Sequence, residues 1–87
     1  MTSDRWCLYV LRFADDTLYT GITTELVRRV REHNLGKGAK YTRSRLPVNV
    51  VYFEGHPDRS SASRAEAAFK KHSRKKKLEI IESLGNQ

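Results

Sequence analysis

Two tyrosines near the start of the chain have side chains that could take part in acid–base or phosphate chemistry. Tyr9 and Tyr19 are separated by nine residues, and Gly21 follows the second tyrosine closely. A phenol has a pKa near 10, so it is a poor proton acceptor at neutral pH unless a nearby cation lowers that pKa. Tyrosine is also a common strand residue, and two half-buried strand aromatics would need no function.

The length of the turn between the tyrosines decides whether their hydroxyl groups can meet. A two-residue turn at Asp15-Asp16 would place the two rings on opposite faces of a hairpin, and this turn type prefers a glycine that is absent here. A three-residue loop over 14–16 would set Tyr9 opposite Gly21 and make the tyrosines diagonal neighbours on one face. We therefore expect an odd loop if the tyrosines act together. Gly21 would then leave an open patch beside Tyr9, where a ligand backbone could come close.

Three further side chains have types suited to phosphate chemistry. Arg29 lies at the edge of the apolar stripe of a predicted helix, one turn before His33, and an arginine there could clamp a phosphate through two parallel hydrogen bonds. Glu66 lies in a later predicted helix, and a carboxylate can hold Mg²⁺ or Mn²⁺. Each residue also has a purely structural interpretation. Arg29 could be an ordinary surface arginine, His33 a packed helix histidine, and Glu66 part of a capping box, Ser63-x-x-Glu66.

The hydrophobic pattern predicts the elements that would position these residues. Strands are expected over 5–13, 17–22 and 47–54, and helices over about 24–35, 61–73 and 74–85. The first strand is apolar on both faces, which is typical of a central strand covered above and below. The order β-β-α-β-α-α indicates an α/β (α+β) class: a small three-stranded, mainly antiparallel sheet flanked by helices.

Several boundaries follow from local signals. Thr23 or Thr24 is expected to cap the first helix, and Gly36 to end it. In the third strand, Val48, Val50 and Tyr52 are expected to alternate with Val51 and Phe53. The second helix is expected to bury Ala62, Ala65 and Phe69, followed by His72 or Ser73.

Composition narrows the class of partner. The chain has 87 residues and a formal net charge of +7, which predicts one domain over 1–87 with its core at about 5–78 and a C-terminal helix and tail over 79–87. Such a charge favours polyanions, nucleic acid first, although a solvated basic face is the alternative. Cys7 is the single cysteine, and we find neither a signal peptide nor a membrane span, so a reducing, cytoplasmic location is expected.

The combination of these residues resembles the signature of the GIY-YIG nucleases. Cys7-Leu8-Tyr9 and Tyr19-Thr20-Gly21 stand where that family has its two triplets. Arg29 falls at the place of the family's helix arginine, and Glu66 at the place of its later glutamate. Over about residues 5–78 the chain looks like the short single-domain bacterial branch. The resemblance to the nuclease modules of the excision-repair incision subunit and of the eukaryotic junction resolvase is more distant.

Two positions depart from the pattern. Cys7 replaces the glycine of the first triplet, a position that is loose in the family. Ile22 stands where some members carry a lysine, so another group must lower a tyrosine pKa if that role is filled at all.

The resemblance implies a divalent-metal-dependent endonuclease that hydrolyses DNA, directed at damaged or branched structures. Its catalytic residues would be Tyr9, Tyr19, Arg29, His33 and Glu66, with Glu66 holding Mg²⁺ or Mn²⁺. One tyrosine would accept a proton and the other would bind or orient the phosphate. The expected nucleic-acid contacts are Lys37, Lys40, Arg43 and Lys71.

Two other functions remain open from the sequence. One is a nucleic-acid-binding domain that keeps the fold without cleaving. The other is a protein-interaction accessory factor. Target choice by the nuclease would depend on a protein partner or on a homodimer, because the chain carries no second DNA-binding module.

Overall fold

The computed structural model of the chain describes residues 5–36 and 46–85. Its elements are β1 (Trp6–Phe13), β2 (Leu18–Thr23), α1 (Leu26–Asn34), β3 (Val48–His56), α2 (Arg59–Lys70) and α3 (Arg74–Gly85). The predicted order β-β-α-β-α-α and the α+β class are confirmed.

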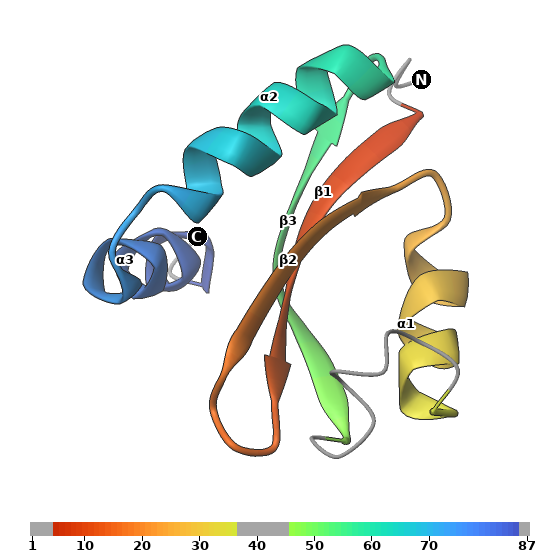
Figure 1. The fold of residues 1–87 in the computed structure, drawn as a ribbon, viewed down its shortest axis with the longest axis vertical. Coiled ribbons are helices and arrows are strands. Elements are labelled where there is room, and N and C mark those ends of the chain that lie inside the picture. The colour runs from red at the N-terminus through yellow and green to blue at the C-terminus, as the bar shows by residue number, and fades with distance from the viewer. Residues whose placement is uncertain (1–4, 37–45, 86–87) are drawn as a thin grey trace.

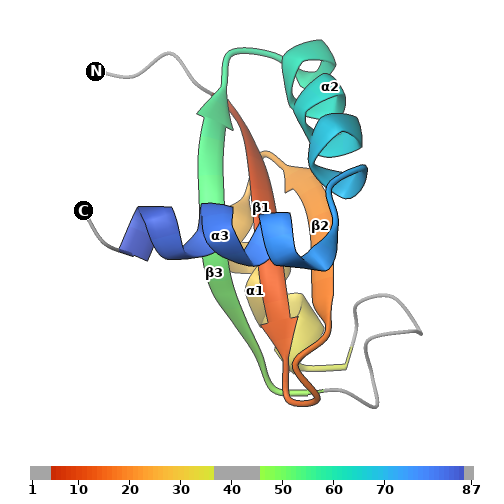
Figure 2. The same cartoon turned by 90° about the vertical axis from the view of Figure 1, so that its left-hand side faces the viewer.

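The three strands form one antiparallel sheet with β1 in the middle, in the order β2-β1-β3. Helix α1 covers one face of the sheet, and α2 and α3 cover the other (Figures 1 and 2). No helix within the described ranges is long and apolar enough to cross a membrane. The apolar character of both faces of β1 is explained by this three-layer arrangement.

Each layer interface has its own buried cluster. Tyr9, Leu11, Phe13 and Val48 form the cluster on the α1 side. Leu8, Val10 and Phe69 form the cluster on the side of α2 and α3. Alternate residues of β1 therefore supply two cores, and this fixes the register of the strand between them.

The β1–β2 turn has the three-residue loop that the sequence favoured. The amide of Asp16 donates to the carbonyl of Phe13 at 2.9 Å, and the amide of Phe13 donates to the carbonyl of Thr17 at 3.0 Å. Asp16 takes a left-handed conformation, with φ of 68°, which aspartate tolerates better than most residues. Tyr9 pairs with Gly21, so the predicted register is confirmed.

Strand β3 corrects the expected alternation. Val10 of β1 pairs with Tyr52 and Leu11 pairs with Val50, so Val51 is an extra residue in the ladder. A β-bulge of this kind places two consecutive residues on one side. Val51 and Tyr52 accordingly both pack on the side of α2, whereas Val50 packs on the side of α1.

The start of α1 also differs from the prediction. Thr23 is the last residue of β2, and its hydroxyl oxygen accepts a hydrogen bond from the Glu25 amide at 3.0 Å. Glu25 is the N-cap of α1 and makes no side-chain capping bond. Gly36 follows the end of α1 with φ of 76°, which confirms the predicted stop.

Helix α2 begins two residues earlier than expected because Asp58 caps it. The Asp58 carboxylate accepts a hydrogen bond from the Ser61 amide at 2.8 Å. The helix ends at Lys70, so His72 and Ser73 lie exposed in the turn before α3 rather than on the buried stripe.

Candidate active site

Tyr9 reaches from the central strand across to the edge strand. A Cβ atom placed on Gly21 would lie 2.7 Å from the Tyr9 hydroxyl oxygen and 3.2 Å from the Tyr19 ring, so the phenol of Tyr9 rests against the Gly21 backbone. The open patch expected beside Tyr9 is therefore wrong, since the tyrosine ring itself fills that space. Gly21 allows a side chain rooted in the middle of the sheet to bring its hydroxyl to β2.

The two tyrosine rings lie together with residues of α1. The Tyr9 and Tyr19 ring centres are 6.3 Å apart, and the Tyr19 and His33 ring centres are 5.5 Å apart. Arg29, one turn before His33 on the same helix, hydrogen-bonds the Tyr9 hydroxyl. The structure thus gathers four of the five predicted catalytic side chains between β2 and α1.

Burial differs sharply within this group. Tyr9 is 1% exposed and His33 is 0% exposed, whereas the Arg29 side chain is 37% exposed. The Arg29 guanidinium also lies 3.6 Å from the Glu32 carboxylate. Arg29 is consequently the member of the group that can meet an anion from solvent, and the buried rings hold it in place.

The electrostatics favour a single positive charge in this cluster. Burial raises the pKa of Tyr9, and this outweighs the hydrogen bond and charge of Arg29, which act in the opposite direction. Burial and the Arg29 charge lower the pKa of His33. At neutral pH the Tyr9 phenol is protonated and the His33 imidazole is neutral, so Arg29 carries the charge.

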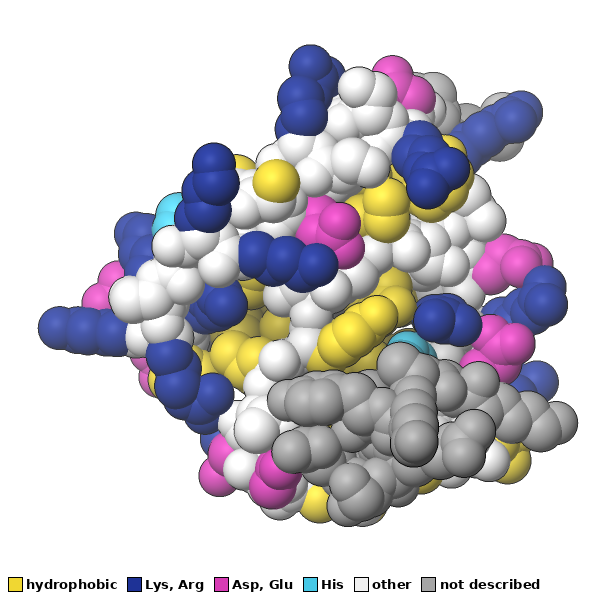
Figure 3. Space-filling view, in the orientation of Figure 1, with side chains coloured by type: hydrophobic (Ala, Val, Ile, Leu, Met, Phe, Trp, Pro, Cys, Tyr) yellow, Lys and Arg dark blue, Asp and Glu magenta, His cyan; other side chains and the backbone are white. Residues whose placement is uncertain are grey.

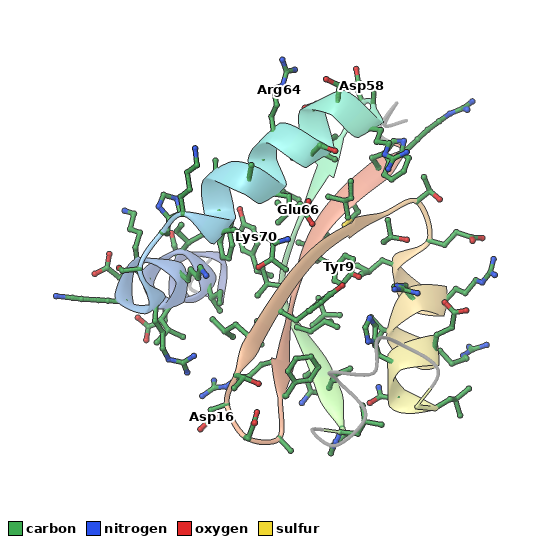
Figure 4. All side chains as sticks on the ribbon, viewed as in Figure 1. Tyr9, Asp16, Asp58, Arg64, Glu66 and Lys70 are labelled. Atoms are coloured by element: carbon green, nitrogen blue, oxygen red, sulfur yellow. The ribbon has the colours of Figure 1, made fainter. Side chains whose placement is uncertain are left out.

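Glu66 lies across β2 from the tyrosines. It belongs to α2, on the other face of the sheet, and its carboxylate pairs with Lys70 Nζ at 3.5 Å. Figure 4 looks onto the open edge of β2, with Glu66 on one side of that strand and Tyr9 on the other. In the same orientation, Figure 3 shows acidic, basic and hydrophobic side chains meeting in this central region.

The capping-box alternative for Glu66 does not hold in the structure. Asp58 supplies the N-cap of α2, and Glu66 lies past the middle of that helix. Its side chain remains 25% exposed. Glu66 is therefore a partly accessible carboxylate on a rigid element, and not a helix cap.

Of the predicted nucleic-acid contacts, Lys71 is exposed at the C-cap of α2. Lys37, Lys40 and Arg43 lie outside the described residues. A metal ion would find few protein ligands, because the described part of the chain contains no group of three or more His, Cys, Asp or Glu residues. Glu66 with water and phosphate oxygens suits Mg²⁺, which keeps several waters and binds through one or two carboxylates.

A second polar cluster was missed by the sequence reasoning. The Tyr52 hydroxyl donates to Glu54 at 2.7 Å, the other Glu54 oxygen lies 2.9 Å from His56 Nε2, and His56 Nδ1 lies 2.7 Å from the Ser61 hydroxyl. Burial and the Glu54 partner raise the pKa of Tyr52 to about 12. The alternation Tyr-x-Glu-x-His along one strand was the available signal. This chain of bonds ties β3 to the first turn of α2.

Comparison with known proteins agrees with this arrangement. The sequence profile of the GIY-YIG catalytic domain matches residues 5–79. The chain belongs to the GIY-YIG family. This is a family of nucleases, and the match spans every strand, α1, α2 and the first half of α3.

Proteins similar to this chain occur in several bacteria. A UPF0213 protein of Streptococcus agalactiae is 51% identical over 80 residues, covering 92% of this chain and 91% of that protein. The solution NMR structure of a protein from E. faecalis is 44% identical, with a TM-score of 0.62 over 93% of this chain and 86% of that one. The solution NMR structure of a UPF0213 protein from Bacillus halodurans is 40% identical, with a TM-score of 0.58 over 88% of this chain and 82% of that one.

Proposed function

We propose that this GIY-YIG protein is a divalent-metal-dependent endonuclease that hydrolyses DNA phosphodiester bonds at the open edge of β2. The observation that carries the proposal is the cluster of Tyr9, Tyr19, Arg29 and His33 beside that edge. The Glu66 carboxylate on the opposite side of the same strand and the net charge of +7 support it.

Arg29 is the phosphate-binding group in this proposal. Its guanidinium is partly exposed, always charged, and held by Tyr9 and Glu32. A fixed cation at the reacting phosphate stabilises the charge that develops on the phosphate oxygens. Arg29 therefore orients the scissile phosphate toward the tyrosine hydroxyls.

The two tyrosines take different roles because their surroundings differ. The raised pKa of Tyr9 keeps its hydroxyl protonated, so Tyr9 donates a hydrogen bond and positions the phosphate or the attacking water. Tyr19 remains the candidate proton acceptor, because the charge of Arg29 acts on Tyr19 as well. The water oxygen attacks phosphorus, one ester P–O bond breaks, and the departing oxygen takes up a proton.

Glu66 would hold the metal ion, with its remaining positions filled by water and phosphate oxygens. When bound, the ion would supply Lewis-acid stabilisation of the phosphate and an easily deprotonated water. The Lys70 ammonium pairs with Oε2 of Glu66. This ion pair orients the Glu66 carboxylate that would hold the metal ion.

The test is a cleavage assay with Mg²⁺ or Mn²⁺ on plasmid, nicked and branched DNA. Glu66→Gln and Arg29→Ala should each lower the rate by about 10²–10³, the usual loss when a transition-state charge partner is removed. Glu79→Gln on α3 and Arg31→Ala on α1 are matched controls, because both residues are exposed. Wild-type rates in both Glu66→Gln and Arg29→Ala would overturn the site.

A DNA-binding domain without cleavage is the second candidate, and Ile22 favours it. Ile22 stands where some family members have a lysine, and here it packs into the apolar cluster beneath α2. This candidate predicts salt-dependent DNA binding with no cleavage in either metal. It also predicts that Glu66→Gln leaves the affinity unchanged whether or not metal is present.

A further inference from the structure

A pocket of about 250 Å³ lies where the β1–β2 hairpin meets the start of α3. It is lined by Thr17, Leu18, Arg74 and Lys77. Figure 2 shows α3 beginning beside β2 and then crossing the sheet past β3. The pocket therefore adjoins the same edge strand that carries Tyr19, but at the opposite end from Gly21.

Both cations of the pocket are held in place by the fold. Arg74 Nη2 donates to the carbonyl oxygen of Asp16 at 2.8 Å. An arginine has five N–H donors, so this bond engages only part of the guanidinium. Lys77 Nζ lies 6.0 Å from the centre of the Phe69 ring, and Lys77 is partly buried, whereas residues 74–76 are exposed.

The acidic groups of the hairpin are directed to other partners. The Asp16 carboxylate pairs with Arg12 at 3.0 Å. The Asp15 carboxylate accepts hydrogen bonds from the Thr17 hydroxyl at 2.6 Å and from the Thr17 amide at 3.1 Å. The groups presented to the pocket as charged donors are thus Arg74 and Lys77, an arrangement that suits an anion.

The pocket and the candidate active site lie on different sides of β2. Leu18 packs with the cluster on the side of α2 and α3, whereas Tyr9 and Tyr19 belong to the cluster on the side of α1. We propose that the pocket binds a second backbone phosphate of the nucleic-acid substrate, distinct from the phosphate held at Arg29.

This inference rests on the proposed function for its ligand, but it can be tested without cleavage. Pre-positioned cations lose less conformational freedom on binding than freely moving surface lysines. The site would consequently set the register and direction of the DNA along β2. The run Arg74–Lys77, which from sequence alone could be only a solvated basic face, would then contain one lysine with a specific role.

The experiment compares Lys77→Gln with Lys76→Gln, which remove the same charge from neighbouring positions of α3. Binding of a fluorescein-labelled duplex of about 20 base pairs is measured by anisotropy in EDTA, between about 50 and 200 mM NaCl. Lys77→Gln should lower the salt slope by about 0.9, equivalent to about 3.5-fold over that range, and Lys76→Gln by clearly less. Equal effects of the two variants, or no effect of either, would overturn the proposal.

A second measurement covers the case in which Lys77→Gln does not fold. The wild-type protein is titrated with the same duplex and followed by the NMR shifts of its backbone amides. The amides of Thr17, Leu18 and Lys77 should shift at the concentrations that shift Arg29, and shifts confined to α1 would contradict the pocket. Loss of cleavage with intact binding would bear on the proposed function and leave the pocket unaffected.

Discussion

At the scale of single residues, Gly21 determines where the Tyr9 hydroxyl can lie. A methyl group at this position would sit 2.7 Å from that oxygen and 2.9 Å from the ring carbon that bears it. Because Tyr9 is 1% exposed, its ring has little room to move aside. Gly21 is therefore required by a close approach of two side chains, and not by its own backbone conformation.

Gly21→Ala tests this dependence. Overpacking of this kind costs about 1–3 kcal/mol of unfolding free energy, and displacement of the phenol should also reduce cleavage. Urea denaturation and cleavage rates measure the two effects.

Gly36→Ala is the matched control for that variant. Its new methyl group would meet no atom of the described residues within 4 Å, but its φ of +76° is unfavourable for alanine. It should lose about 1–2 kcal/mol of stability while the cleavage rate per folded molecule is preserved. A Gly21→Ala protein that cleaves at the wild-type rate would show that the position of Tyr9 does not matter.

At the scale of elements, the two helices that carry Arg29 and Glu66 begin differently. Helix α2 has a side-chain cap from Asp58, whereas the N-cap residue of α1, Glu25, makes no such bond. The difference predicts unequal costs for removing the two acidic side chains.

Asp58→Ala should lower the unfolding free energy by about 1 kcal/mol, since one backbone amide of α2 loses its partner. Glu25→Ala should cost less, because it removes only an exposed ion pair with Arg28. Thermal and urea denaturation of both variants measure the effect. A larger loss in Glu25→Ala would contradict the capping assignment.

The elements also show what the sequence could and could not predict. The central position of β1 was predictable because both of its faces are apolar, and the odd hairpin loop was predictable from the poor fit of a two-residue turn at Asp15-Asp16. The bulge at Val51 was not predictable, because an extra residue in a run of branched and aromatic side chains leaves the hydrophobic pattern almost unchanged. The cap at Asp58 was missed because Ser60, Ser61 and Ser63, which can also cap a helix, follow it in the sequence.

The candidate site, like the fold, could be predicted from the sequence only in part. The resemblance supplied Tyr9, Tyr19, Arg29 and Glu66, but spacing alone could not place Glu66 on the face of the sheet opposite Tyr9. It also could not show that Tyr9 fills the space above Gly21. Both facts depend on how side chains pack around the edge strand β2, and only the folded sheet determines that packing.

At the scale of the whole molecule, ionisable groups in the interior limit the pH range of stability. Burial and the Arg29 charge lower the pKa of His33 below its usual value of 6.5. The unfolded chain then binds more protons than the folded one below that pH, so stability is full above pH 6.5 and falls as the pH decreases. Tyr52 limits stability at alkaline pH. Its pKa rises from 10.0 to about 12 in the folded chain, so the unfolding free energy falls as the pH rises through that interval.

Burial also raises the pKa of the Cys7 thiol above its usual value of 9.0, so urea denaturation should show a plateau only between about pH 6.5 and 9. His33→Gln should flatten the acidic side of the profile, whereas His72→Gln, which changes an exposed histidine, should leave it unchanged. An acidic limb with the same slope in His33→Gln and in the wild-type protein would show that other groups are responsible.

Within residues 5–36 and 46–85, the strand order β2-β1-β3 leaves the outer side of β2 unpaired, and this has a consequence for self-association. A free strand edge can recruit a strand from another molecule, which is a route to aggregation. Copies that each carry a net charge of +7 repel one another at low ionic strength, and β2 has only six residues. The positive charge that attracts a polyanion therefore also keeps other copies of the chain away from the edge of β2. A high salt concentration weakens both effects.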